Sequence, residues 1–115
     1  MTPKKEKHLQ DKINAVQDSM FVIGGKWKLP ILVAIYYGNK RFNDISAAIP
    51  KITARVLSKE LKHLEENLLI KRTIINDYPV KIEYTTTDYF MTITEIIHPL
   101  ESWGKKHRKK LTGKK

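Results

Sequence analysis

The chain has 115 residues, enough for one domain with a buried core, and its 41% apolar and 30% charged residues are typical of a globular protein. It contains no cysteine, which excludes disulfides and thiolate metal sites, and no apolar run approaches the roughly 18 residues of a membrane span. The formal net charge of +10 favours a polyanionic partner, but its position along the chain decides what it means.

Most of the positive charge lies at the two ends. Residues 105–115 contain seven Lys or Arg and no acid, whereas residues 13–104 have a net charge of only +1. Such tails are often simply solvated, so the total charge decides little. We therefore predict a basic tail over 1–10, one domain over 11–104 and a Lys-rich tail over 105–115.

The charge inside the predicted domain is unevenly distributed. Residues 40–72 hold eight basic groups against four acidic ones, whereas residues 83–101 hold four acidic groups and no Lys or Arg. A compact fold of this sequence should therefore have a basic face formed by its middle third. That pattern is typical of a nucleic-acid-binding protein.

Apolar residues recur at helical spacing over about 11–23, which predicts a first helix ended by Gly24–Gly25. A second helix is predicted to begin near Lys26 and to be closed by Gly38. Pro30 falls in its first turn, where a missing N–H costs little.

Two further helices are predicted before residue 67. The stretch RFNDISAAIP favours a short helix with Asn43 as a plausible cap and Pro50 as its end. The stretch TARVLSKELKHLEE follows a tight turn, with Thr53 as the N-cap of a longer helix over 53–66.

The last third of the chain predicts a hairpin and a final helix. Two β-branched runs on either side of DYP indicate a β-hairpin over 69–86. Thr87–Asp88 would cap the final helix, which Pro99 should kink or restart. The predicted fold is therefore mainly α with a small β-hairpin (α+β), a winged helix-turn-helix with an extra helix at each end.

The helix over 53–66 is the candidate for DNA recognition. Arg55, Lys59 and Lys62 are spaced to lie on one side, opposite a leucine stripe that should face the core. Many solvated surface helices share this pattern. Its position after a short helix and tight turn, and before a wing, favours insertion into a DNA major groove.

Each candidate DNA contact has a plain structural alternative. Arg55 could bind a guanine edge and the lysines suit phosphates, whereas Thr53 more simply caps its helix. Basic groups on the hairpin could equally be solvated. The candidate contacts are Arg41, Lys51, Thr53, Arg55, Ser58, Lys59, Lys62, Arg72 and Lys81.

Several ordered motifs resemble one protein family. They are IGGKW at 23–27, RF at 41–42, IT-x-x-VLS-x-x-L-x-x-LE across 52–65, then KIEYTTT and SWG. Together they resemble the HxlR-type transcriptional regulators, bacterial winged-helix proteins related to the MarR group. The resemblance covers about residues 13–104. It implies a homodimer, built from the terminal helices, that binds a palindromic operator in double-stranded DNA.

The sequence departs from the family pattern at three positions. Many members carry a sensor cysteine where this chain has Asn14, so thiol sensing is chemically impossible here. Leu68 stands where a glycine often follows the recognition helix, and Asn67 is expected to supply the left-handed residue instead. Phe90 replaces a glycine that often starts the last helix, so that helix could begin differently or could pack an extra aromatic at the dimer interface.

The expected dimer interface uses the apolar faces of about 11–23 and 88–103. Its candidate residues are Ile13, Val16, Met20, Phe90, Ile93, Ile97, Leu100 and Trp103.

The four histidines are scattered and no nucleophile motif is present, so we predict no metal site, no cofactor and no enzymatic activity. The expected partners are double-stranded DNA and a second copy, with no membrane and with any small-molecule effector unknown. Without a signal-like start, the expected location is the cytoplasm, with the nucleoid. The alternatives are a non-specific architectural DNA or RNA binder driven by the basic tails, and a protein-interaction module.

Overall fold

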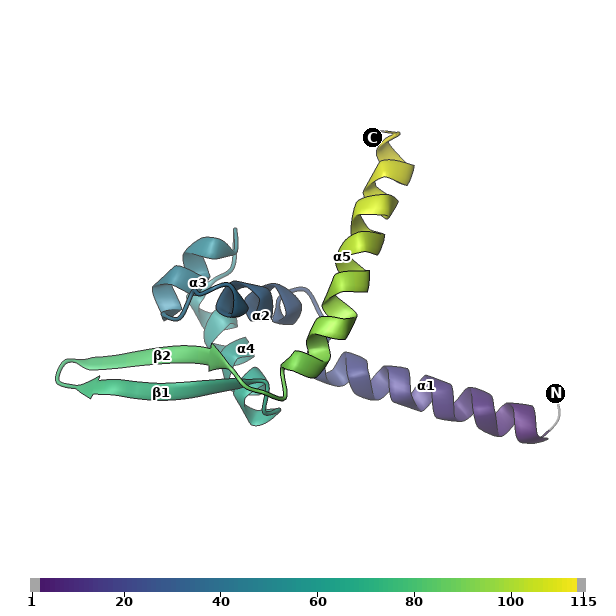
Figure 1. Cartoon of the computed structure of the whole chain (residues 1–115), viewed down its shortest axis with the longest axis horizontal. Helices are drawn as coiled ribbons and strands as arrows, with labels where there is room; N and C mark the ends of the chain where they lie inside the picture. Colours follow the sequence, from purple (N-terminus) through teal and green to yellow (C-terminus); the bar gives the residue numbers. More distant parts are fainter. Residues whose placement is uncertain (1–2, 114–115) are drawn as a thin grey trace.

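The computed structural model describes residues 3–113, which form five helices and one hairpin (Figure 1). The elements are α1 (Pro3–Ile23), α2 (Lys28–Tyr36), α3 (Phe42–Ala48), α4 (Ala54–Glu66), β1 (Ile70–Asp77), β2 (Val80–Thr86) and α5 (Met91–Thr112). The predicted fold class and element order are confirmed. Residues 1–2 and 114–115 of the two predicted tails lie outside the described residues.

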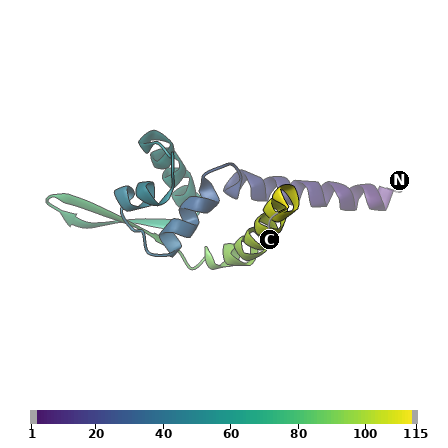
Figure 2. The same cartoon turned by 90° about the horizontal axis from the view of Figure 1, so that it is seen from above.

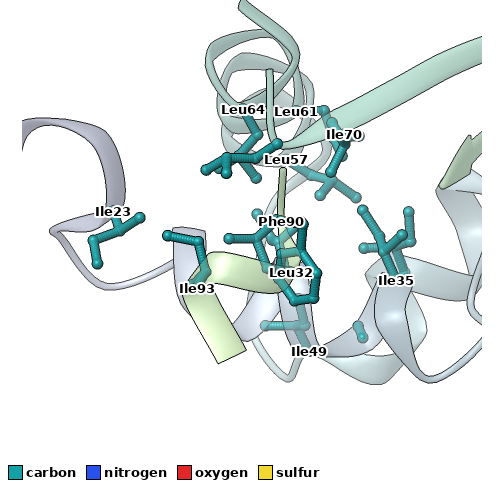
Figure 3. Close-up of a cluster of buried hydrophobic side chains, with 14 of the residues drawn as sticks. Ile23, Leu32, Ile35, Ile49, Leu57, Leu61, Leu64, Ile70, Phe90 and Ile93 are labelled. Carbon is teal, nitrogen blue, oxygen red and sulfur yellow. The ribbon is translucent and has the colours of Figure 1, made fainter. Parts of the chain in front are cut away.

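The core lies where α2, α3 and α4 meet the base of the hairpin and the start of α5 (Figure 3). Leu57, Leu61 and Leu64 point inward from α4, as the leucine stripe predicts, and meet Leu32 and Ile35 of α2. Each fully buried Leu or Ile contributes about 1.5–3 kcal/mol relative to an exposed one. This core fixes the orientation of α4, whose opposite side faces solvent.

A tight turn separates α3 from α4. Thr53 caps α4 as predicted, because its Oγ1 accepts a hydrogen bond from the Val56 N–H at 3.2 Å. Lys51 makes the turn with a φ of 70°. The predicted cap of α3 is wrong, since Asn43 lies inside the helix and Arg41 occupies the N-cap position without a side-chain cap bond.

The hairpin is antiparallel and its turn lies at Asp77–Val80, in the predicted DYP segment. A register irregularity between Ile74 and Asn76 leaves Ile75 without a partner on β2. The wing is tied to the body by a hydrogen bond from the Tyr84 N–H to the Lys40 carbonyl oxygen at 2.8 Å. The wing therefore keeps a fixed base while its tip extends from the body (Figure 1).

The residues after α4 differ from the prediction. Asn67 has an ordinary φ of −93°, and Leu68 itself takes the left-handed conformation with a φ of 67°. A left-handed residue with a side chain costs about 1–2 kcal/mol. The Thr87 hydroxyl donates to the Leu68 carbonyl oxygen at 2.6 Å, which helps to hold this turn.

Both terminal helices are longer than predicted. α1 begins at Pro3 rather than near residue 11, and α5 continues through Pro99 to Thr112, so residues 3–10 and 105–112 of the two basic tails are helical. α5 begins at Met91, because Thr87 caps the preceding turn by accepting from the Phe90 N–H at 3.2 Å.

The two terminal helices project from the body in different directions (Figures 1 and 2). The radius of gyration is 17.5 Å, whereas a compact monomer of this length has a value of about 13 Å. Among the described residues, no single helix is long and apolar enough to cross a membrane. The pair Lys4–Ile23 and Lys28–Tyr36, bent by 61°, meets that requirement by length and composition only.

Candidate nucleic-acid interface

The outer side of α4 is basic over its first three turns. Arg55, Lys59 and Lys62 are exposed, and Ser58 is exposed beside them. Their spacings of four and three residues put the three cations on one side of the helix. The positive end of the helix dipole lies at the same N-terminal end, so the two fields add.

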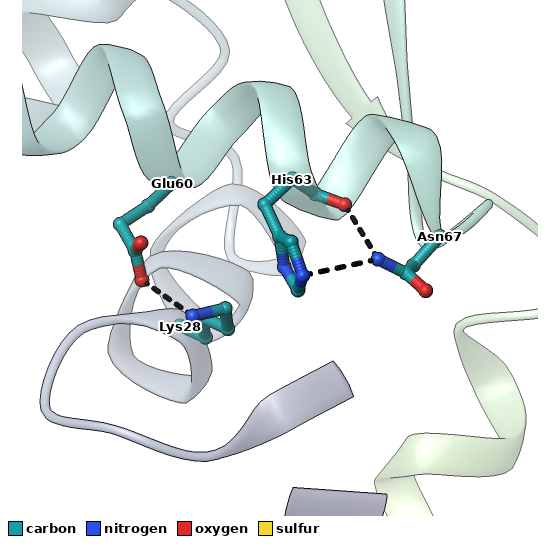
Figure 4. Close-up of polar contacts among 4 residues, drawn as sticks. All are labelled: Lys28, Glu60, His63 and Asn67. Carbon is teal, nitrogen blue, oxygen red and sulfur yellow. Dashed lines mark hydrogen bonds and ion pairs between the residues drawn. The ribbon is translucent and has the colours of Figure 1, made fainter. Parts of the chain in front are cut away.

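The one acid in this part of α4 is turned inward. Glu60 is buried, and its Oε2 lies 3.0 Å from the Nζ of Lys28 on α2 (Figure 4). The Lys28 ammonium group therefore compensates the Glu60 carboxylate inside the fold, and the carboxylate does not lie among the cations on the outer side of the helix. The spacing of α4 alone gave no signal for this pair, because Lys28 is 32 residues away.

His63 joins α4 to α1. Its half-buried ring meets the Phe21 ring edge-on, with centroids 5.6 Å apart, and Nδ1 has no hydrogen-bond partner within the described chain. The Asn67 Nδ2 lies 3.4 Å from Nε2 and donates to the His63 carbonyl oxygen at 3.0 Å (Figure 4). His63 therefore packs between helices and does not extend the basic surface.

The other candidate contacts lie around α4. Arg41 and Lys51 are exposed at the two ends of the α3 region, and Thr53 is engaged in capping. On the wing, Arg72 is exposed and Lys81 is half-buried. Their roles in DNA binding stay predictions.

The Lys-rich end of α5 lies apart from α4, on a helix that runs away from the hairpin (Figure 1). Lys105 there bonds the Glu101 carboxylate at 2.8 Å. That hydrogen bond, followed by the Lys105 charge, lowers the pKa of Glu101, and the same bond raises the pKa of Lys105. The largest block of positive charge is therefore separate from the α4 surface.

The residues proposed for the dimer interface divide into two groups. Val16 and Met20 are each 56% exposed, Trp103 is 62% exposed, and Ile13 and Leu100 are also exposed. Phe90 and Ile93 are instead buried in the core of their own chain, Phe90 completely (Figure 3).

The prediction that Phe90 and Ile93 contact a second copy does not fit this burial, because both side chains are already covered within their own chain. The first turn of α5 is the part that docks onto α2 and α4, and Ile97 is half-buried just after it. The prediction also omitted Leu9 and Phe21, two exposed apolar residues of α1. Leu9 could have been found from its spacing of four residues from Ile13.

A short helix, a tight turn, a second helix with a basic outer side, and a two-stranded wing define a winged helix-turn-helix protein. Residues 22–112 match the model of the HxlR-like helix-turn-helix family. The chain belongs to this family of transcriptional regulators.

Relatives and solved structures agree with this assignment. The chain is 35% identical over 96 residues to YdeP, an uncharacterized HTH-type transcriptional regulator of Bacillus subtilis (strain 168), covering 84% of this chain and 75% of YdeP. It resembles the redox regulator HypR in its reduced form with a TM-score of 0.79 and 33% identity, covering 86% and 98% of the two chains. A MarR-family chain from Enterococcus faecalis V583 has a TM-score of 0.73 and 30% identity, covering 86% and 90%.

Proposed function

We propose that this chain acts as a homodimer that binds a specific palindromic operator in double-stranded DNA and regulates transcription there. α4 enters the major groove and the wing lies along the backbone or in the minor groove. The observation that carries the proposal is the outer side of α4. With Glu60 turned toward Lys28, this surface presents Arg55, Lys59 and Lys62, and the exposed acids of α4, Glu65 and Glu66, lie only at its C-terminal end.

The proposed roles follow from side-chain chemistry. Arg55 lies in the first turn of α4, the part of a recognition helix that reaches base edges, and a guanidinium can bind guanine O6 and N7 together. Lys59 and Lys62 lie further along the same side and suit phosphates. Lys51, Arg72 and Lys81 supply further backbone contacts from the turn and the wing.

The proposed dimer rests on surfaces that a single chain leaves uncovered. On α1, Leu9, Ile13, Val16 and Met20 form an exposed apolar stripe. On α5, Leu100 and Trp103 continue the apolar side beyond the core. A groove of about 500 Å³ between α2, the end of α3 and α5, lined mainly by apolar side chains, adjoins Leu100. Packing these surfaces against a second copy would remove them from water and place two copies of α4 on one operator.

The proposed site of action is the nucleoid, in the cytoplasm. Thiol oxidation is excluded as its signal, because the chain has no cysteine. In this respect it differs from a redox regulator that senses through thiols.

Selection of bound sequences from a random DNA pool, followed by titration at several salt concentrations, tests the proposal. We expect a palindrome with half-sites about one helical turn apart. Affinity should fall about 10³–10⁵-fold between 50 and 200 mM salt if about 6–10 phosphates are contacted. A salt-dependent affinity without sequence preference would overturn the proposal in favour of a non-specific architectural binder.

A further inference from the structure

A second cavity lies on the side of α5 that faces the C-terminal end of α2. Its volume is about 380 Å³, within the range of roughly 300–1,000 Å³ that small-molecule sites occupy. It is more enclosed than the groove next to Leu100, and polar side chains line its mouth. It adjoins the groove assigned above to a second copy, with which it shares Val33, Ile97 and Glu101.

The floor and one wall of this cavity are aromatic. Phe90 lies at its base, with the Tyr36 ring 5.2 Å away between centroids and tilted by 43°. The Tyr37 ring stands at 86° to that of Tyr36, with centroids 5.6 Å apart. Val33 and Ile97 complete the apolar lining. A flat ring entering this corner would meet both ring faces and ring edges, which is the arrangement that aromatic groups prefer.

The polar mouth of the cavity contains an anionic side chain. Thr94, His98 and Glu101 line it, and no Lys or Arg is among the lining residues. The neighbouring Lys105 hydrogen bond lowers the pKa of Glu101, so this carboxyl is an anion at neutral pH. Lys105 itself is largely exposed and contacts the carboxylate from outside the cavity. Exposed ion pairs of this kind exchange partners at little cost.

We propose that this cavity binds a small aromatic amine. The ring would occupy the corner formed by Tyr36, Tyr37 and Phe90, and the ammonium group would lie at the mouth beside Glu101. Negative ring faces favour a cation, and the carboxylate supplies its counter-charge. An aromatic carboxylate of the same size would instead meet Glu101 and the same ring faces with like charge. The site is independent of the proposed DNA contacts, since none of its residues lies on α4 or the wing.

Three probes that share a 2-phenylethyl group and differ in the charge of the terminal group test the site on the full chain by calorimetry and NMR: 2-phenylethylamine, 2-phenylethanol and 3-phenylpropanoate. We expect the amine to bind most tightly, about tenfold more tightly than the carboxylate. Glu101→Gln should reduce the affinity for the amine to that for the alcohol, and leave the alcohol unchanged. Absence of binding for all three, or equal affinity for amine and carboxylate, would overturn the proposal.

A pair of variants on one helix locates the site. Thr94→Phe should fill the cavity and abolish binding of the amine, whereas Thr92→Phe, two residues away and outside the lining, should leave it unchanged. Tyr37→Ala removes an exposed wall without touching the core and should weaken binding as well. If binding of the amine survives both Thr94→Phe and Tyr37→Ala in folded protein, the amine lies elsewhere.

Discussion

Lys28 and Glu60 form an ion pair that joins α2 to α4, with 3.0 Å between Nζ and Oε2 and with side-chain exposures of only 15% and 12%. Removing one partner leaves the other charge largely desolvated. We expect Lys28→Met to lower the free energy of unfolding by about 2 kcal/mol, somewhat less than for a fully buried pair. Chemical denaturation measures this loss directly.

A double variant separates the pair's net contribution from the cost of an orphaned charge. Lys28→Met combined with Glu60→Leu replaces both charges by apolar groups of similar size. Its stability should return to within about 1 kcal/mol of the parent chain, because a buried pair and a well-packed apolar pair are often equivalent. A double variant as unstable as Lys28→Met alone would show that the carboxylate is not what destabilises the single variant.

Replacing Arg55 by alanine and replacing Lys59 by alanine should affect DNA binding in different ways. Arg55→Ala should cost about 1–3 kcal/mol on the selected operator and relax base preference at one position. Lys59→Ala should weaken binding to all sequences alike and reduce the slope of log affinity against log salt by about 1. Lys109→Ala, on the far part of α5, is the matched control and should leave base preference intact. Unchanged affinity and preference in Arg55→Ala would remove it from the proposed interface.

The apolar stripe on α1 predicts a charge-sensitive dimer. Val16→Glu should give a folded monomer, because a carboxylate in a dry interface must be desolvated without a partner. Ala15→Glu, about 100° around the same helix from Val16 and outside the apolar stripe, adds the same charge and should remain dimeric. Sedimentation measures both. A dimeric Val16→Glu variant would place the interface elsewhere.

Glu101 and Lys105 predict a pH window for the middle of α5. A lowered carboxyl pKa means that the stabilisation from Glu101 is present above its unfolded pKa and is lost as the pH falls through its folded pKa. A raised amine pKa means that the stabilisation from Lys105 is present below its unfolded pKa and is lost as the pH rises through its folded pKa. The pair should therefore be intact across neutral pH and lost at both extremes.

Carboxyl-carbon NMR titration tests this pair. In Lys105→Gln the pKa of Glu101 should return toward its ordinary value, because its largest cause, the hydrogen bond, is gone. Lys106→Gln removes the same charge from the adjacent position and should leave the Glu101 pKa lowered. Equal effects of the two variants would mean that general charge, and not the bond, controls it.

The stability of a Phe90 variant distinguishes a role of this residue in the core from a role in the dimer interface. Because it is completely buried in its own chain, Phe90→Ala should cost about 3–5 kcal/mol of unfolding free energy. Tyr89→Ala, at an exposed neighbouring position, should cost less than about 1 kcal/mol. A stable Phe90→Ala chain that no longer dimerised would restore the interface role.

Much of the fold could be predicted because it depends on patterns among residues that are close together in the sequence. The leucine stripe of α4, the Thr53 cap and the turn before Pro79 each depend on residues within a few positions of one another. Their confirmation follows from the short range of helix periodicity and turn chemistry. The basic side of α4 could be predicted for the same reason.

The errors concern contacts between distant segments. No residue near Phe90 in the sequence indicates that Tyr36 and α4 surround it in the fold. An apolar residue that packs in the core and one that packs in a dimer interface therefore look the same in the sequence. Leu68 takes the left-handed conformation because the chain must bury both Leu69 and Ile70, the first residue of β1, and this tertiary packing outweighs the local preference of Leu68. Lys28 and Glu60 meet only once the chain is folded.

The direction of α1 is set by one short joint. Gly25 has a φ of 89°, and a Cβ at Gly24 would overlap the Met20 carbonyl oxygen, so both positions favour glycine. From this glycine turn, α1 extends as one continuous helix about 30 Å long. A rotation of about 10° at the glycines would move its far end by about 5 Å, more than the roughly 3.4 Å between successive nucleotides of one DNA strand. In the proposed dimer, the accuracy of this joint would therefore govern whether the two copies of α4 match the spacing of their half-sites.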